Sequence, residues 1–461
     1  MTGPDRAKGM TARRLLVLAS AAYPLGGLAT WMAGLLPGLE EAGWEATLAL
    51  VEGSHGSAAA FLARHPWHRT VTIPNPTGTV LGRRRALAGA IERVDPALVL
   101  VVNLESVYPA VQELRARERW GGRLVMTLHG FTPGLIEDVR RFRAVLDGVV
   151  FSNALGVAAL REWEYLAGER VLRAGYGVSL PDALPEEEEA EGPLEIVWAG
   201  RFEESQKRIA DLARIVSELE ASGEPFRLHL AGSGPEEAGL RERLAPALAA
   251  GRVLLHGELP RERVLGEVMR PGRVLLVTSS WETGPIVALE AVSRGMAVVT
   301  TDYVGRRAEA LLRHGETALV FPVGDAEAGC RVLRELADPG RRRALAGAAW
   351  LEVSRRCSPR AALADWTAAL ESVLALSPLP RPLPPEPPGP AGRLDRWCGV
   401  RGAEVVRRLT GVRVRHESAG SEWPHTAGSN ESMNELLARL RQLEQGIFWP
   451  GHLLPDGRRS G

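Results

Sequence analysis

Short apolar runs alternate with longer amphipathic stretches along most of the chain. Before residue 178 the apolar runs are nearly continuous in valine and leucine, as strands buried on both faces of a parallel sheet require. Helix-period stretches such as GRRRALAGAIERV (82–94) separate these runs. The predicted strands are RRLLVLAS (13–20), EATLALVEG (45–53), TVTIP (70–74), LVLVVN (98–103), RLVMTLH (123–129) and GVVFSN (148–153). This alternation predicts a doubly wound α/β domain over residues 1–178.

The same alternation restarts after a polar break. Residues 179–193 contain four consecutive glutamates and three prolines, which predicts an acidic linker because little of it can be buried. Strand-like runs then recur until about Leu376: LEIVWAG (194–200), FRLHLAG (226–232), RVLLHG (252–257), RVLLVTSS (273–280), AVVTTD (297–302) and ALVFP (318–322). We therefore predict a second doubly wound, Rossmann-like domain over residues 194–376. The two domains are expected to face a central cleft, with ligands at the carboxyl ends of the strands.

A different pattern follows the second domain. Residues 377–392 form a proline-rich segment that is expected to be an extended linker. The appendage, residues 393–461, contains a basic stretch and one predicted helix, SNESMNELLARLRQL (429–443), whose Ser and Glu spacing suits an N-terminal cap. The favoured expectation for the basic stretch is a small solvated appendage, and the alternative is a contact with a membrane surface or a partner.

The segment from Leu15 to Leu39 carries no charge and follows two arginines. A signal peptide or membrane anchor is therefore one interpretation. Prolines and glycines interrupt the segment, which favours a buried strand, a glycine turn and a helix.

Composition narrows the class of protein. The 461 residues have a formal net charge of zero, so an electrostatic nucleic-acid binder is not expected. The three cysteines, Cys330, Cys357 and Cys398, show neither disulfide-framework nor zinc-ligand spacing. We expect a reducing, cytoplasmic location, with a peripheral contact at the inner membrane face as a further alternative.

The stretch SSWETGPIVALEAVSRGMAVVTTD (279–302) carries two glutamates eight positions apart. Glu282 follows a predicted strand, so it should lie in the loop at the carboxyl edge of the sheet. Gly284 lies between that loop and Pro285, which suits the first position of a helix. Glu290 then lies inside this helix, and the two carboxylates are expected on one side of the cleft.

The start of this helix is a predicted anion site. The amides of Ile286 and Val287 should point out of its amino end, where phosphate binds readily. One carboxylate can accept hydrogen bonds from sugar hydroxyls and the other can clamp a diol such as a ribose. The arrangement suits a sugar linked through a diphosphate to a nucleoside. The alternative is an ordinary surface helix with Glu290 in solvent.

Two cations are predicted at the same edge. VWAGRFEESQKR places Arg201 after the first strand of the second domain and Lys207 at a helix start. Only two lysines occur in the chain, Lys8 and Lys207, against 54 arginines from a total of 56 basic residues. A compact ammonium is therefore expected to be required at position 207, unless it is a stray surface lysine. Two fixed cations would stabilise a departing diphosphate.

The first domain offers weaker signals. SAAYPLGGLATWM predicts a turn at Gly26 and Gly27 before a helix, a layout that allows close backbone approach to a phosphate or sugar. His129 ends a predicted buried strand and should face the cleft, although a structural role is equally expected for a lone histidine. AGSGPEEAG (231–239) lacks the third glycine of a dinucleotide fingerprint. The absence of a D-x-D pair or a His/Asp cluster predicts no metal requirement.

Together, YPLGG, TLHG, GRFEESQK, LHLAGSGPE, SSWETGPIVALEAVSRGMAVVTTD and AEALLRHGETALVFPVGD resemble the retaining GT-B glycosyltransferases of family 4, the group 1 glycosyl transferases. The resemblance covers about residues 13–376, and its most specific part is the spacing of Glu282 and Glu290 combined with Arg201 and Lys207. Arg208 replaces the usual glycine after the motif lysine, and AGYGV (174–178) replaces the more frequent Pro-Asn-Gly turn.

The resemblance implies transfer of a sugar from a nucleotide donor with retention of configuration, without metal or cofactor. It implies that Glu290 binds the ribose hydroxyls and that Glu282 lies against the donor sugar. Arg201 and Lys207 would hold the diphosphate, assisted by Gly27 and the amides of Ile286 and Val287, while His129 would lie near the donor sugar. The implied partners are a nucleotide sugar and a glycan, lipid-linked or small-molecule acceptor, and no nucleic acid.

Two other functions remain open on the sequence. Sugar-nucleotide epimerases share this architecture, but they require additional acid and base groups, and few are found beyond His129. A non-catalytic nucleotide-sugar-binding scaffold is the non-enzymatic alternative. The intact charged residues at every expected position argue against it.

Overall fold

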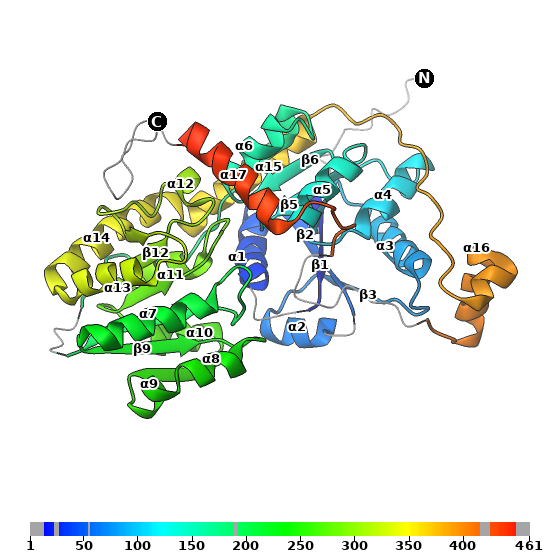
Figure 1. The fold of residues 1–461 in the computed structure, drawn as a ribbon. Helices are drawn as coiled ribbons and strands as arrows, with labels where there is room; N and C mark the ends of the chain where they lie inside the picture. The colour runs from blue at the N-terminus through cyan, green and yellow to red at the C-terminus, as the bar shows by residue number, and fades with distance from the viewer. Residues whose placement is uncertain (1–12, 23–26, 54–55, 188–191, 415–424, 449–461) are drawn as a thin grey trace, which may run out of the picture.

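The structure is a computed structural model, and it describes residues 13–22, 27–53, 56–187, 192–414 and 425–448. Two α/β domains lie side by side, and the C-terminal segments run over the outside of the first (Figure 1). The predicted fold class is confirmed: each domain is built on an open parallel sheet with helices on its faces.

The first domain contains a seven-stranded parallel sheet in the order β3-β2-β1-β4-β5-β6-β7. Its strands are β1 (Arg13–Ser20), β2 (Trp44–Val51), β3 (Thr70–Ile73), β4 (Leu98–Val102), β5 (Arg123–Leu128), β6 (Gly148–Phe151) and β7 (Val171–Arg173). The six predicted strands are present with ends within two residues, and β7 was missed because three residues are too few to form a recognisable apolar run. Leu15 and Val17 of β1 face one apolar core, and Leu16 and Leu18 face the other.

Helices cover both faces of this sheet, which is why its inner strands, such as β4, are apolar throughout. The first-domain helices are α1 (Gly27–Glu41), α2 (Ala58–Arg64), α3 (Val80–Val94), α4 (Val107–Ala116), α5 (Pro133–Phe142) and α6 (Ala154–Glu162), with the short η1 (Gly168–Arg170). The uncharged segment from Leu15 to Leu39 forms β1 and most of α1, so the interpretation as strand and helix is confirmed. The turn between them lies partly outside the described residues.

The second domain contains a six-stranded parallel sheet in the order β10-β9-β8-β11-β12-β13. Its strands are β8 (Leu194–Ala199), β9 (Phe226–Ala231), β10 (Val253–Gly257), β11 (Val274–Val277), β12 (Ala297–Thr301) and β13 (Leu319–Phe321). Its helices are α7 (Ile209–Ser222), α8 (Glu237–Arg243), α9 (Ala245–Ala249), α10 (Arg261–Arg263), η2 (Val264–Val268), α11 (Ile286–Ser293), α12 (Arg306–Glu309), α13 (Ala326–Arg334), η3 (Glu335–Ala337) and α14 (Pro339–Arg356). In both sheets the strand order reverses beside the first strand, at β1 and at β8. Such switch points are where open α/β sheets bind ligands.

The chain then returns to the first domain through α15 (Pro359–Ala375). Trp366 of α15 is buried against α1, and its indole Nε1 donates a hydrogen bond to the carbonyl of Gly175 at 3.0 Å. Helix α15 therefore ties the end of the second domain back to the first domain.

The proline-rich segment lies along the outside of the first domain without helix or strand (Figure 1). Gln112 of α4 donates to the carbonyl of Leu383 at 2.9 Å, and Arg84 of α3 donates to that of Glu386 at 3.2 Å. The segment is thus extended, as predicted, but it is held against the first domain, whereas an unpacked linker was expected. It leads to α16 (Arg393–Thr410), which contacts α3.

The last described helix, α17 (Met433–Phe448), packs on both domains, touching α6 of the first and α12 of the second. Leu436, Leu440 and Glu444 are fully buried. This helix is therefore part of the folded body, because its apolar side finds a complementary surface where the two domains meet.

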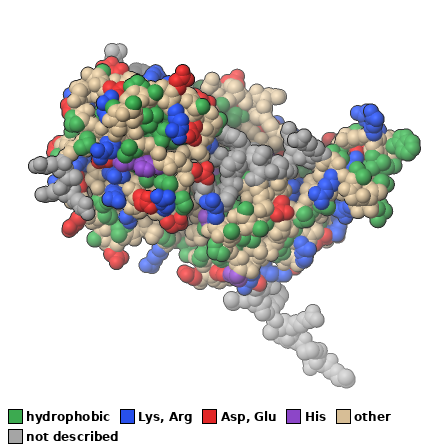
Figure 2. All heavy atoms as spheres, turned by 90° about the horizontal axis from the view of Figure 1, so that it is seen from below, with side chains coloured by type: hydrophobic (Ala, Val, Ile, Leu, Met, Phe, Trp, Pro, Cys, Tyr) green, Lys and Arg blue, Asp and Glu red, His purple; other side chains and the backbone are tan. Residues whose placement is uncertain are grey.

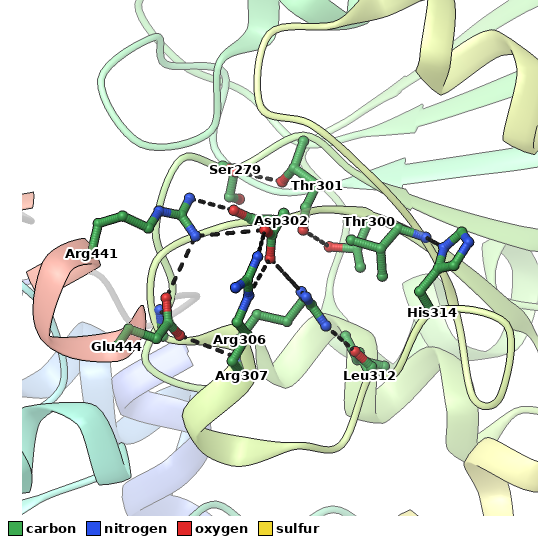
Figure 3. A network of polar contacts seen from close by, with 12 residues as sticks. Ser279, Thr300, Thr301, Asp302, Arg306, Arg307, Leu312, His314, Arg441 and Glu444 are labelled. Carbon is green, nitrogen blue, oxygen red and sulfur yellow. Dashed lines mark hydrogen bonds and ion pairs between the residues drawn. The ribbon is translucent and has the colours of Figure 1, made fainter. Parts of the chain in front are cut away.

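A charged network joins α17 to the second domain (Figure 3). The carboxylate of Glu444 accepts hydrogen bonds from the amides of Gly305 at 3.0 Å and Arg307 at 3.1 Å. Asp302 pairs with Arg306 at 2.7 Å and with Arg307, and Arg441 adds a third cation. Burial alone would raise the pKa of Asp302, but these arginines hold it below its usual value. The network fixes α17 to the loop after β12.

Within the described ranges, no helix combines the length and apolar character needed to cross a bilayer.

Candidate active site

A cavity of about 650 Å³ lies between the two domains, at the carboxyl ends of β5 and β8 and beside the amino end of α11. Nine of the ten sequence-predicted site residues line it: Gly27, His129, Arg201, Lys207, Glu282, Gly284, Ile286, Val287 and Glu290. The tenth, Gly26, lies outside the described residues. Residues separated by more than 260 positions thus meet in one place, because the carboxyl ends of the strands in the two domains face each other across the cavity.

Glu282 and Lys207 form an ion pair in the wall of this cavity. The ammonium Nζ of Lys207 lies 2.6 Å from Oε1 of Glu282. The same carboxylate accepts hydrogen bonds from the hydroxyl of Ser279 at 2.7 Å and the side-chain amide of Gln206 at 3.1 Å. Glu282 is buried, and its charge is held in place by donors from two loops. The pairing explains why a compact ammonium fits at position 207.

Arg201 lies beside this pair and also lines the cavity. Its guanidinium Nη2 is 3.7 Å from Oε1 of Glu203, so one carboxylate partly balances it. Glu203 in turn accepts hydrogen bonds from the amides of Gln206 and Lys207. The loop after β8 is therefore cross-linked internally, and it holds Arg201 and Lys207 at one edge of the cleft.

The loop before α11 requires a glycine at position 284. Gly284 has a φ of +129°, and a Cβ there would lie 2.9 Å from the ring of Tyr176. Pro285 forms the N-cap, so α11 begins at Ile286, one residue later than predicted. The amides of Ile286 and Val287 belong to the first helical turn, where intrahelical partners are lacking, and their residues line the cavity. The amino end of this helix consequently faces the space into which an anion would fit.

Glu290 lies one turn deeper in α11 and is nine-tenths buried. Its Oε1 accepts a hydrogen bond from Nε of Arg261 at 2.6 Å. Burial raises the pKa of Glu290, while the neighbouring Arg261 acts in the opposite direction. Glu290 is therefore neither solvated nor free of partners, and the surface-helix interpretation is wrong.

His129 follows β5 and is enclosed by aromatic rings. Its Nδ1 lies 2.9 Å from the hydroxyl of Tyr176, and its ring centroid is 4.3 Å from that of Trp31. Burial lowers the pKa of His129 to about 3, so the imidazole is neutral near pH 7. Its Nε2 has no protein hydrogen-bond partner among the described residues. A neutral imidazole donates from one nitrogen and accepts at the other, so a hydroxyl that reached this buried Nε2 would form a hydrogen bond with it.

The two domains touch at this point. Thr283 of the second domain donates a hydrogen bond to the carbonyl of His129 at 2.9 Å. A Cβ on Gly27 would lie 3.7 Å from the side chain of Ile286, which is an ordinary contact distance. The amino ends of α1 and α11 therefore approach each other across the cavity.

Sequence reasoning missed several residues of the cavity. Gln206, Arg261 and Tyr176 hold Glu282, Glu290 and His129, respectively. The glycine loop after β9, set aside as an incomplete dinucleotide fingerprint, also lines the cavity. A Cβ on its Gly232 would lie 1.9 Å from the carbonyl of Gly200, so the loop packs closely on the first turn. A strand end followed by small residues was the only available signal for this loop.

The arrangement is suited to an elongated, negatively charged ligand with hydroxyl groups. Arg201, Lys207 and the amino end of α11 supply positive charge, while Glu282 and Glu290 supply acceptors on either side. No group of three or more His, Cys, Asp and Glu side chains that could hold a metal ion occurs within the described part of the chain.

Residues 193–338 match a family model described as glycosyl transferases group 1. The match falls in the second domain and contains Arg201, Lys207, Glu282 and Glu290. It confirms the resemblance drawn from the sequence motifs at the level of this group. No curated protein sequence gives a significant match.

The fold is that of several solved glycosyltransferases. HepE from Anabaena, in complex with UDP and glucose, superimposes with a TM-score of 0.64 and 15% identity, covering 78% of this chain and all of that one. Sucrose-phosphate synthase from Thermosynechococcus elongatus superimposes with a TM-score of 0.62 and 18% identity, covering 79% of this chain and 100% of that one. The lipopolysaccharide outer core galactosyltransferase WaaB, in its apo form, superimposes with a TM-score of 0.61 and 15% identity, covering 78% of this chain and 99% of that one. These similarities establish the GT-B architecture.

Proposed function

Taking the group 1 match of the second domain as the premise, we propose that the protein is a retaining glycosyltransferase. It would move a sugar from a nucleotide-diphosphate sugar to an acceptor hydroxyl without a metal ion. The observation that carries the proposal is the meeting of Arg201, Lys207, Glu282 and Glu290 with the amino end of α11 in one interdomain cavity. That the HepE structure contains UDP and glucose supports testing uridine donors first.

The proposed donor pose follows from the charges. Glu290 would accept hydrogen bonds from the ribose hydroxyls, because it is largely buried in the cavity wall and Arg261 steadies it. The diphosphate would lie between the guanidinium of Arg201, the ammonium of Lys207 and the amides of Ile286 and Val287. In taking this place it would share Lys207 with Glu282.

The sugar would then lie against Glu282 and His129. The neutral His129 would contact a sugar hydroxyl through Nε2, which fits its depressed pKa and its lack of a protein partner at that atom. No ionised nucleophile is required. The bond from the anomeric carbon to the phosphate oxygen breaks, the acceptor oxygen bonds to the same face, and its proton passes to the departing diphosphate. The protein contributes position and charge stabilisation.

Glu290→Ala tests the donor site. We would incubate wild type and variant with a panel of nucleotide sugars and follow release of free nucleotide and the thermal midpoint together. One donor class should raise the midpoint of wild type and be slowly hydrolysed. The variant should bind that donor at least about tenfold more weakly, because it loses hydrogen bonds to a charged group.

Glu327→Ala is the matched control, since Glu327 lies on the exposed face of α13. It should behave like wild type. A donor that binds Glu290→Ala and wild type equally would place the ribose elsewhere. Interconversion of the donor sugar without its release would support the epimerase alternative, and binding without any turnover, even with acceptors, would support the scaffold alternative.

A further inference from the structure

The appendage presents an unusual surface at the far end of the first domain. Figure 1 places α16 at the end of that domain most distant from the second domain. Among the described residues, eleven large hydrophobic side chains are exposed, and six of them belong to the short stretch between residues 383 and 412. Trp397 is 93% exposed and Leu409 is 82% exposed. Such a concentration of exposed apolar side chains marks an interaction site.

The fold sorts the charges of this stretch by sign. Both acidic residues of α16 are buried: Asp395 pairs with Arg407, and Glu404 accepts hydrogen bonds from Thr77 and Thr79 at 2.9 and 2.6 Å. The remaining arginines are exposed. We call this surface the tip patch, and it consists of Arg393, Arg396, Trp397, Arg401, Val405, Val406, Arg408, Leu409, Val412 and Arg413. Its solvent-facing charges are all positive.

The geometry of α16 holds the patch in place. The helix is kinked at Cys398 and Gly399, and the ion pair between Asp395 and Arg407 fastens its first turn to its second part. Positions 401, 405 and 408 follow one stripe of the second part, so arginine and valine side chains lie side by side on the outer face, and Val412 follows just past the end of the helix. The inner face, with Ala403 and Glu404, packs on the first domain. Figure 2 shows hydrophobic and basic side chains together at this end of the molecule.

We propose that the tip patch binds the surface of a membrane containing anionic lipids. Trp397, Leu409 and Val412 would enter the region between headgroups and acyl chains, and the surrounding arginines would pair with lipid phosphates. A helix with an exposed apolar stripe flanked by arginine and tryptophan is suited to this boundary. The projecting position of α16 lets a flat surface approach without touching the cavity.

The other partners fit the patch less well. A nucleic acid would use the arginines but leave Leu409 and Val412 in water. A second copy of the chain would bring five exposed arginines against five more, and like charges across an interface oppose association. Of these three partners, the anionic bilayer alone offers both an apolar layer and negative charge over a flat area.

Vesicle flotation tests the proposal, with full-length protein and vesicles of phosphatidylcholine alone or phosphatidylcholine mixed with phosphatidylglycerol. Wild type should float with the mixed vesicles and largely stay behind with the neutral ones. Trp397→Ala with Leu409→Ala should lower the partition coefficient by about tenfold, and so should Arg396→Gln with Arg401→Gln. High salt should weaken the binding of wild type to the mixed vesicles, and it should weaken the binding of the arginine variant less.

Leu351→Ala and Arg93→Gln are the matched controls, because both residues are exposed but lie away from the tip patch. Both should float like wild type. Unchanged thermal midpoints in all four proteins would show that they fold. The proposal would be overturned if wild type does not float with mixed vesicles, or if the variant without Trp397 and Leu409 floats equally well. A wild type that does not float, but self-associates or binds an oligonucleotide in a way that the variants lose, would also overturn the proposal.

Discussion

Paired charges, rather than isolated ones, organise the cavity at the scale of residues. Glu282 is paired with Lys207, and Glu290 with Arg261. A buried carboxylate without a partner is costly, so these pairs hold both acids in place before a ligand arrives. The positions of Glu282, Glu290 and Lys207 could be predicted, because they lie after a recognisable strand, inside the helix that follows it, and at a helix start, respectively.

Their partners could not be predicted in the same way. Gln206 lies 76 positions from Glu282, and Tyr176 lies 47 positions from His129. No local pattern links such residues, since the contacts arise only when two strand ends or two domains are brought together. Tyr176 also occupies the place where the resemblance predicted a different turn, so family patterns gave no guide to it.

His129 should make the stability of the protein depend on pH. Its folded pKa is about 3, against 6.5 for an ordinary histidine. Between these values the unfolded chain binds the proton and the folded one does not, so stability is complete above pH 6.5 and falls as the pH is lowered. From pH 6.5 to 5 the free energy of unfolding should fall by up to about 2 kcal/mol through this residue.

Urea unfolding of wild type and His129→Gln at pH 7 and pH 5 measures this effect. The variant should lose less stability on acidification than wild type. His68→Gln is the control, because that ring is more than half exposed. An identical loss in wild type and His129→Gln would mean that His129 is protonated in the folded protein.

At the scale of elements, the local sequence of α17 predicts where the helix begins but not where it packs. Its start was predicted from a Ser and a Glu spaced for a capping box, and the structure contains that box: Ser432 and Glu435 bond to each other's amides at 3.3 and 2.7 Å. Its position was not predictable. The surface that covers Leu436 and Leu440 is assembled from α6 and α12, which lie far apart in the chain.

Glu444→Ala should destabilise the junction between α17 and the second domain. The change leaves the amides of Gly305 and Arg307 without their buried acceptor, so the free energy of unfolding should fall by about 1–3 kcal/mol. Thermal or urea unfolding measures it. Gln445→Ala, at the exposed neighbouring position, should change little. Equal stability of both variants would show that α17 does not depend on this network.

At the scale of the whole molecule, the chain is a GT-B pair of domains with a tail that returns to both. The alternation of apolar runs predicted the two sheets because the inner strands are buried on both faces. The contacts of the tail escaped prediction because they are made by short segments against surfaces formed elsewhere. The two helices of the tail differ in their placement. Helix α17 joins the domains, while α16 projects from the first domain with its basic and apolar side chains exposed.

The central claim is that sugar transfer occurs in the interdomain cavity with retention of configuration. Proton NMR of the reaction with the donor that the panel identifies tests it most directly, by recording the anomer of the first sugar released to water or acceptor. Retention predicts the same anomer as in the donor, with no release above background in Glu290→Ala. A first product of inverted configuration, or equal release by the variant, would contradict the claim.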